Sequence, residues 1–130
     1  MSSAVGTFQV KLSPQVTDGD ARLGRLSIEK QFQGDLEATS KGEMLTGGTP
    51  VKGSAGYVAM ELVTGKLHGR SGSFILQHTG TLDRGKPSLS VTVVPDSGTD
   101  QLTGLTGKMA INIADGKHSY ELQYTLEPQT

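Results

Sequence analysis

Residues 108–126, KMAINIADGKHSYELQYTL, decide the fold of this chain. Apolar and polar side chains alternate on both sides of the dipeptide Asp115-Gly116. Alternation is typical of strands with one buried face, and Asp-Gly is a strong signal for a two-residue hairpin turn. Such a turn pairs Ile111 with Tyr120, so the apolar faces of the two strands coincide. The segment therefore predicts an antiparallel hairpin.

The same period of two recurs along most of the chain. It is clear in Leu26–Phe32, and a three-residue loop at Gln33–Asp35 pairs Phe32 with Leu36. Eight strands are predicted in total, and the weakest apolar pattern lies at Thr39–Gly42. Further strands are predicted at Phe8–Leu12, Tyr57–Lys66, Ser73–Leu82 and Leu89–Val94, with the main loops at Thr46–Ser54 and Pro95–Gly107.

An antiparallel sheet of this size avoids exposed edges either as a two-sheet sandwich or as a closed barrel. Short connections between consecutive strands favour a meander, and an eight-stranded barrel is just wide enough to hold one small ligand. We therefore predict an all-β fold, a closed antiparallel β-barrel of about eight strands in mostly meander order. It occupies residues 1–130 as a single domain.

The composition excludes several classes of protein. The chain has 12 basic and 13 acidic side chains, a formal charge of −1 and no cysteine. The balanced charge gives no basic surface for nucleic acid or acidic lipid, and the lack of thiols excludes disulfides and thiolate metal sites. Met1–Gly6 lacks the charged and apolar regions of a signal peptide. We therefore expect a cytoplasmic protein that binds neither nucleic acid nor membranes.

Glu61 and His78 form the pair with the most evident chemistry. A two-residue turn at Gly69–Arg70 places them opposite each other, with Cβ atoms about 5 Å apart. Their face is mostly apolar and is predicted to point inward. Burial raises the pKa of the glutamate and lowers that of the histidine, and their mutual attraction has the opposite effect on each. A titratable pair of this kind suits general acid–base catalysis. The alternative is a buried polar pair that only satisfies its own hydrogen bonds.

Other polar and aromatic side chains share this inward face. An unpaired buried ammonium is costly, so we expect Lys30 near an open end or beside a carboxylate such as Glu61. A tyrosine inside a barrel supplies bulk and a hydroxyl that needs a partner, and core packing is the alternative to a ligand contact. The predicted ligand-binding residues are Tyr57, Phe74, His118, Tyr120, Tyr124 and Lys30.

The three histidines give no metal-binding pattern. His68, His78 and His118 stand at no local ligand spacing, and His68 is predicted to lie in a turn. The sequence also contains no glycine-rich phosphate loop, nucleophile elbow or zinc-protease helix. We therefore predict no metal and no cofactor.

An apolar row is predicted on the outer surface of the barrel. Val58, Met60, Leu62 and Ile75 alternate with the face that carries Glu61. Exposed apolar patches of this kind usually mark contact surfaces. The simplest expectation is a homo-oligomer formed through these strands.

Five separated motifs resemble a bacterial protein family of unknown function. They are FQGDL (32–36), GSAGYVAME (53–61), GSFILQH (72–78), VVPDSGT (93–99) and GKHSY (116–120). The resemblance extends from about Leu26 to Leu126. It implies a barrel similar to those of the allene oxide cyclases. No residue-by-residue match to the cyclase site is present, so the resemblance implies no reaction.

Three functions remain open. The first is binding of a small, largely apolar molecule oriented by Glu61, His78 and a tyrosine, because ligand pockets are mostly apolar with few polar groups. The second is a cofactor-independent isomerase, cyclase or lyase with Glu61 or His78 as base and Tyr120 or Tyr124 as donor. The third is a structural or regulatory homo-oligomer with a filled core. A cavity that reaches the Glu61–His78 pair favours the first two.

Overall fold

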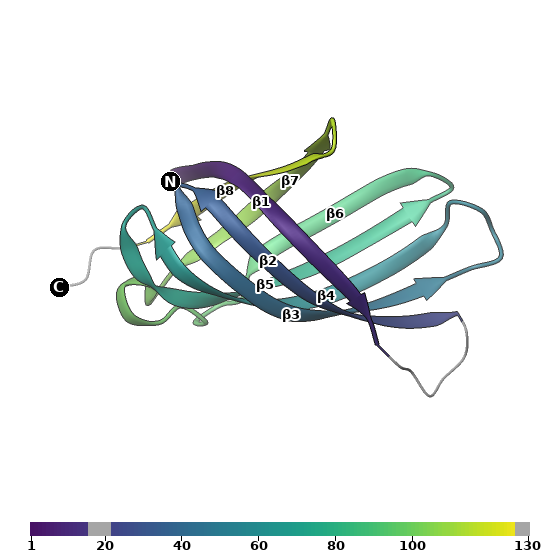
Figure 1. Cartoon of the computed structure of the whole chain (residues 1–130), viewed down its shortest axis with the longest axis horizontal. Coiled ribbons are helices and arrows are strands. Elements are labelled where there is room, and N and C mark those ends of the chain that lie inside the picture. The colour runs from purple at the N-terminus through teal and green to yellow at the C-terminus, as the bar shows by residue number, and fades with distance from the viewer. Residues whose placement is uncertain (16–21, 127–130) are drawn as a thin grey trace.

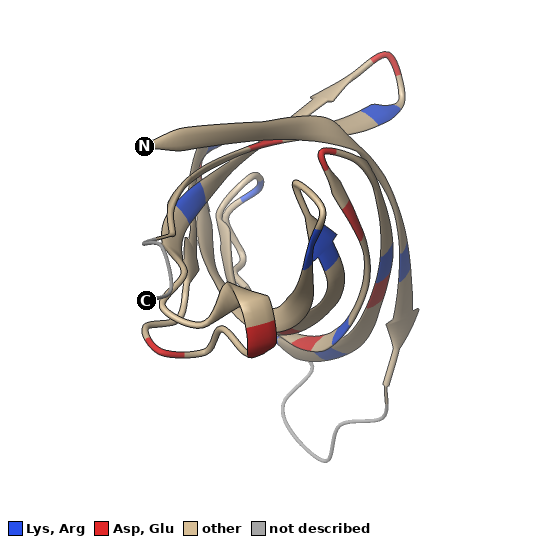
Figure 2. Ribbon diagram, turned by 90° about the vertical axis from the view of Figure 1, so that its left-hand side faces the viewer, with Lys and Arg blue, Asp and Glu red and all other residues tan. Residues whose placement is uncertain are grey.

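The strands of this chain follow one another around a closed barrel. The computed structural model describes residues 1–15 and 22–126. In these residues eight antiparallel strands each pair with the next, and the last pairs with the first (Figures 1 and 2). They are β1 (Ser2–Pro14), β2 (Leu23–Gly34), β3 (Leu36–Gly48), β4 (Ala55–Leu67), β5 (Arg70–Asp83), β6 (Lys86–Val93), β7 (Thr106–Ala114) and β8 (Lys117–Thr125), with the 3₁₀ turn η1 (Asp100–Leu102) before β7. The prediction of a closed all-β meander barrel is confirmed.

The β7–β8 hairpin has the predicted register. Ile111 pairs with Tyr120, and Met109 pairs with Leu122. The turn residues Asp115–Gly116 both have positive φ, 53° and 75°. Positive φ at both positions is what the favoured two-residue hairpin turn requires, because its twist then matches that of the strands. The local sequence is therefore sufficient to define this hairpin.

The β4–β5 hairpin is shifted by two residues from the prediction. Its turn is His68–Gly69 and not Gly69–Arg70, so Glu61 pairs with Leu76 and not with His78. Histidine adopts the left-handed region more readily than most residues, and the turn histidine has φ of 47°. A shift of two residues leaves every side chain on its predicted face. The predicted direct pairing is wrong, but the two side chains still share the inner face.

The β2–β3 hairpin is also shifted by two residues. Phe32 pairs with Ala38 and not with Leu36. The connecting residues are held by other strands, because the Asp35 N–H donates to a β1 carbonyl at 3.0 Å and the Leu36 N–H donates to the Tyr120 hydroxyl at 2.9 Å. Contacts with β1 and β8 thus set the width of this connection, and the turn residues alone do not encode it.

Two predicted loops are shorter than expected. β3 continues to Gly48, past the expected loop start at Thr46, and β7 begins at Thr106. The segment before β7 lies along the first part of β5, where Thr99 donates its N–H to Ser73 O and Val94 donates its N–H to Ile75 O, both at 2.9 Å. These bonds replace the strand pairing that the short β6 does not provide.

The interior of the barrel has a packed half and an open half. The packed half, here called the closed end, contains the β2–β3 and β4–β5 turns and is covered by Leu102 and Leu105, which are 1% and 0% exposed. At the opposite end, here called the mouth, the inward-facing Leu82, Leu89 and Ile113 are 43%, 46% and 65% exposed. The closed-end core consists mainly of Phe8, Phe32, Leu36, Val63, Leu67, Phe74, Leu76, Leu102, Leu105, Tyr120, Leu122 and Tyr124.

The outer surface carries the predicted apolar row. Val58, Met60 and Leu62 are about half exposed on β4, and Ile75 beside them on β5 is partly buried. Basic and acidic residues are interspersed around the ring of strands in Figure 2. No helix in the described part of the chain is long and apolar enough to cross a membrane.

Candidate functional site

A polar cluster lies between the closed end and the mouth. It consists of Lys30 on β2, Ser40 on β3, Glu61 on β4 and His78 on β5, so four consecutive strands each contribute one side chain. All four are buried, and Glu61 is 0% exposed. Ser40 lies in the segment of β3 with the weak apolar pattern. That pattern is weak because its inner face meets this cluster and not the apolar core.

Glu61 is the centre of the cluster. Its Oε1 accepts hydrogen bonds from His78 Nε2 at 2.8 Å and from Lys30 Nζ at 3.1 Å. Its Oε2 accepts from Ser40 Oγ at 2.5 Å. The predicted contact between Glu61 and His78 is therefore present, although it runs diagonally across the two strands. Lys30 lies beside this carboxylate, which is one of the two positions expected from the sequence.

The contacts determine the charge of Glu61. Burial alone would raise the pKa of this carboxyl, but the hydrogen bond from His78, the charge of Lys30 and the hydrogen bond from Ser40 outweigh burial and lower it. Glu61 is therefore ionised at neutral pH. Lys30 Nζ also lies 4.8 Å from the Phe8 ring centroid and 5.8 Å from that of Phe32, so aromatic rings contribute to its surroundings.

The ionised carboxylate also determines which nitrogen of His78 donates to it. An ionised carboxylate only accepts hydrogen bonds, so Nε2 of His78 carries the proton between them. The other ring nitrogen, Nδ1, is not part of this contact. This Nδ1 atom has no hydrogen-bond partner in the described residues. Every completely buried side-chain nitrogen or oxygen among those residues has one. His78 Nδ1 is therefore not completely buried.

A cavity of about 460 Å³ occupies the mouth above this cluster. Its walls come from the last part of β3, the first part of β4, the last part of β5 and the first part of β6. Met44, Leu82, Pro87 and Leu89 make the walls apolar, and Tyr57 brings a phenol into them. The cavity is lined as far down as Gly80, the next inward position after His78. It does not include Glu61 or His78 in its lining, so the cavity does not reach the Glu61–His78 pair as the sequence analysis required.

Tyr57 connects the cavity with the polar cluster. Its ring centroid lies 6.4 Å from that of His78. Tyr57 pairs with Gly80 across β4 and β5, and a Cβ atom on that glycine would lie 2.3 Å from Tyr57 Cε1. The glycine therefore makes room for the ring to lie across β5. Burial and the negative charge of Glu61 raise the pKa of Tyr57, so its hydroxyl remains a donor at neutral pH.

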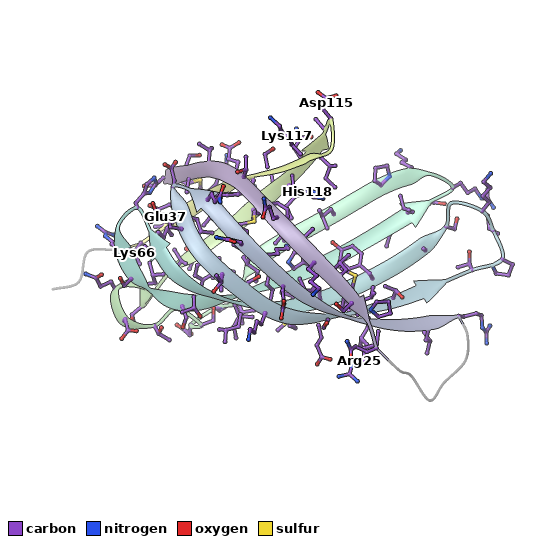
Figure 3. All side chains as sticks on the ribbon, viewed as in Figure 1. Arg25, Glu37, Lys66, Asp115, Lys117 and His118 are labelled. Atoms are coloured by element: carbon purple, nitrogen blue, oxygen red, sulfur yellow. The ribbon has the colours of Figure 1, made fainter. Side chains whose placement is uncertain are left out.

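The other predicted ligand-binding residues lie away from the cavity. Phe74 is 1% exposed in the closed-end core. The Tyr120 hydroxyl donates to Gln33 O at 3.0 Å and accepts the N–H of Leu36, which is a structural role. His118 packs against Phe8 with ring centroids 5.2 Å apart, near the β7–β8 turn. In Figure 3 it lies below the tip that carries Asp115 and Lys117.

Tyr124 belongs to a cluster at the closed end that the sequence did not predict. Its hydroxyl hydrogen-bonds to Nδ1 of His68, whose Nε2 lies 3.5 Å from Asp35 Oδ2. This contact could not be predicted from the turn sequence around His68, because the partners of the histidine come from β8 and from the β2–β3 connection. No group of three histidine or carboxylate side chains able to hold a metal occurs in the described ranges.

Comparison with known proteins agrees with the resemblance found in the sequence. A family profile described as a protein of unknown function (DUF3224) matches residues 4–124. The structure is similar to a crystal structure of a DUF3224-family protein with unknown function from Shewanella oneidensis MR-1, at 51% sequence identity, a TM-score of 0.93 and coverage of 99% of both chains. No curated protein gives a significant match. None of these comparisons names a ligand or a reaction.

Proposed function

The chain belongs to the DUF3224 family, whose function is unknown, and we propose from its geometry that the mouth of the barrel binds a small, largely apolar molecule. The observation that carries the proposal is the cavity of about 460 Å³ at the mouth. Small-molecule sites have volumes of about 300–1,000 Å³, and the volume of this cavity lies in that range.

The character of the cavity wall supports this proposal. Leu82 and Leu89 face inward and remain 43% and 46% exposed, so apolar surface is left in water at the mouth. Burying such surface under an apolar ligand stabilises the complex by about 25 cal/mol per Å² of apolar area. The closed end below is filled with buried side chains, so it forms the floor of the site.

One polar group in the cavity wall is available to orient a ligand, and a polar cluster lies just below the cavity. The Tyr57 hydroxyl is a hydrogen-bond donor in the cavity wall, and it has no partner in the described residues. His78 is the next inward position below Gly80 and does not line the cavity, and its ring centroid lies 6.4 Å from that of Tyr57. Glu61 has both oxygens occupied by Lys30, Ser40 and His78, so it acts by holding the imidazole and not by touching the ligand. A ligand with one hydroxyl or carbonyl group fits this arrangement.

Titration with a neutral naphthalene fluorophore tests the proposal. We expect its emission to rise and shift to the blue on binding to the protein, because the mouth is apolar. Leu89→Glu places a charge in the wall and should weaken binding about tenfold or more. The matched control is Leu62→Glu on the outer face, where the leucine is 50% exposed compared with 46% for Leu89. Absence of binding to the wild-type protein, or equal loss in both variants, contradicts the proposal.

Catalysis is a second candidate, favoured by the 2.8 Å contact between His78 Nε2 and Glu61 Oε1. A carboxylate that orients a histidine leaves its other nitrogen free to act as a general base. The donor would be Tyr57 and not Tyr120 or Tyr124, because those two hydroxyls are engaged at the closed end. This reading supports a cofactor-independent isomerase, cyclase or lyase.

The catalytic proposal is tested by proton exchange. A panel of small ketones in heavy water, followed by NMR, reports abstraction of a proton next to the carbonyl. We expect His78→Asn to abolish the exchange and Glu61→Gln to slow it by about 100-fold. Exchange at the wild-type rate in His78→Asn would contradict the assigned role.

We also propose that the chain forms a homo-oligomer through the apolar row on β4 and β5. The half-exposed Val58, Met60 and Leu62 support this, because they form a continuous apolar row on one strand. This proposal is independent of the cavity. It also covers a structural or regulatory role, although the open mouth disfavours a completely filled barrel.

A further inference from the structure

The barrel is barely closed between β6 and β7. In the described residues these strands share a single pair, Thr92 with Lys108, whereas β7 and β8 are paired along their whole length. Beyond that pair the strands diverge, and in Figure 1 the tip of the β7–β8 hairpin rises away from β6. We call this opening the seam. Two strand edges therefore face each other across it without pairing.

The backbone of β6 directs every second residue into the seam. The Val94 N–H donates to Ile75 O of β5 at 2.9 Å. Successive residues of an antiparallel strand point their N–H and C=O groups to opposite sides, so Ser90 bonds to β5 and Leu89 points to the seam. Among the described residues Leu89 has no partner on that side. Pro87 also turns its nitrogen to the seam and carries no N–H there, which is a usual place for proline in an edge strand.

The edge of β7 is free over a longer stretch. The two-residue turn Asp115–Gly116 makes Ala114 and Lys117 a hydrogen-bonded pair, so the even-numbered residues of β7 point their backbone groups to β8. Ile111 and Ile113 point theirs to the seam, and neither pairs there with any strand in the described part of the chain. Each of these two residues therefore offers a backbone N–H and a C=O to a new strand.

A cavity of about 330 Å³ lies where the two strands begin to diverge. Both edges line it, with Leu89–Thr92 of β6 on one side and Lys108–Ala110 of β7 on the other. On the outer surface the exposed side chains of Ser90 and Thr92 form part of its rim. The space between the two edges is therefore not filled by side chains of the described residues.

We propose that the seam receives one extended peptide segment of a partner protein, which adds a strand antiparallel to the free edge of β7. In strand addition the backbone hydrogen bonds provide affinity, and alternate side chains provide specificity. The segment has apolar side chains on its inward face, beside Ile111 and Ile113, which point into the barrel. Its outward face is polar, beside the exposed Asn112.

The strands on either side of the seam favour a peptide over a second copy of this chain. Every other strand of the described barrel pairs on both sides, so a second copy has only its own β6 or β7 edge to present. Either edge is backed by a further strand, β5 or β8, and would bring a whole sheet into a space bounded on both sides. A single extended segment adds only one strand spacing, about 4.8 Å. The seam acts through backbone groups and needs no ligand in the mouth.

Hydrogen exchange of single amides, followed by NMR, tests whether the edge is free. In the protein alone we expect the N–H groups of Ile111 and Ile113 to exchange at least about tenfold faster than those of Ala110 and Asn112, which are bonded to β8. Equal protection of all four amides would show that the edge already has a partner. Protection that increases with protein concentration would show that a second copy occupies it. Either result overturns the proposal.

The binding probe is a synthetic peptide in which threonine alternates with isoleucine or valine, with a lysine at each end. We expect it to bind the wild-type protein in isothermal titration calorimetry and to slow exchange at Ile111 and Ile113. N-methylation of two of its apolar residues removes the N–H groups that face β7 and should weaken binding about tenfold or more. The matched control carries the same two methyl groups on threonines, whose N–H groups face away from β7, and should lose less. Absence of binding by the unmodified peptide, or equal loss in both methylated forms, contradicts strand addition.

Ile111→Pro tests the same edge from the side of the protein. It removes an N–H that points to the seam and leaves the hydrogen bonds to β8 in place. We expect the peptide to bind about tenfold more weakly to this variant and with unchanged affinity to Ile111→Val, the control that keeps the N–H. Circular dichroism checks that both variants are folded. Wild-type affinity in a folded Ile111→Pro variant would show that β7 does not hold the peptide.

Discussion

Glu61 carries its charge in the middle of the barrel only because its neighbours compensate it. Removing one member of a buried ion pair leaves the other uncompensated, which typically costs about 3–5 kcal/mol. We therefore expect Glu61→Gln to lower the free energy of unfolding by about 3 kcal/mol at neutral pH. The matched control is Glu37→Gln on the outer face of β3, where exposure to solvent makes the expected change smaller than about 0.5 kcal/mol.

The same variant has a defined pH dependence. The pKa of Glu61 is lower in the folded protein than its ordinary value of 4.5, so its contribution to stability is complete above pH 4.5 and is lost as the pH falls through the folded value. The difference between the wild-type protein and Glu61→Gln should therefore shrink in acid. Urea unfolding at neutral pH and at about pH 3 measures it. A difference that stays constant would show that the charge is not responsible.

Gly80 controls the position of Tyr57 at the mouth. A Cβ atom there would lie 2.3 Å from the ring, so Gly80→Ala must push the ring away and cost about 1–3 kcal/mol of stability. We expect the affinity for the neutral fluorophore to fall about tenfold as well. Gly47→Ala is the control, since a Cβ at this strand glycine has nothing within 4 Å. Unchanged fluorophore binding in Gly80→Ala would show that Tyr57 does not contact the ligand.

At the scale of elements, β8 fastens the closed end of the barrel. Tyr120 accepts the N–H of Leu36 in the β2–β3 connection, and Tyr124 bonds to His68 in the β4–β5 turn. One strand therefore joins two hairpins that are remote in the sequence. Both hydroxyls therefore contribute to the stability of the fold, whereas the Tyr57 hydroxyl makes no hydrogen bond within the described residues.

The three tyrosines should accordingly separate stability from binding. Tyr120→Phe leaves a buried N–H without an acceptor and should cost about 1–3 kcal/mol, while Tyr124→Phe should cost about 1 kcal/mol. Tyr57→Phe loses no hydrogen bond within the described residues, so its free energy of unfolding should stay within about 0.5 kcal/mol of wild type. Its affinity for ligands that carry a hydroxyl should fall. Denaturant unfolding and fluorophore titration of the three variants check this order. Equal losses of stability would contradict it.

The hairpins show which elements the sequence can define. The Asp115–Gly116 turn fixes its own register, because both residues favour positive φ. At His68–Gly69 the choice between two overlapping glycine turns is not local, and the predicted register was wrong by two residues. At β2–β3 the register depends on bonds from β1 and Tyr120, which no turn rule contains.

At the scale of the whole molecule, the sequence predicts the face of a side chain but not its height in the barrel. Alternation correctly placed Glu61, His78, Phe74 and Tyr124 on the inner face, because a register error of two preserves the face. Height depends on how far each strand is staggered against its neighbour, which accumulates around a barrel. For this reason Phe74 and Tyr124 were expected at the ligand but lie in the closed-end core.

Association of whole molecules is the prediction that depends only on the outer surface. Val58, Met60 and Leu62 are each about half exposed, which is a small area compared with the roughly 800 Å² that each partner of a stable complex usually buries. We therefore expect a concentration-dependent oligomer, which sedimentation equilibrium would detect. Met60→Glu should shift it to monomer, whereas Thr64→Glu, further along the same exposed row, should have a smaller effect. A protein that is monomeric at all concentrations, or an oligomer indifferent to Met60→Glu, would show that this face has no partner of its own kind. Because the row lies outside the barrel and the cavity inside it, ligand binding should be the same in monomer and oligomer.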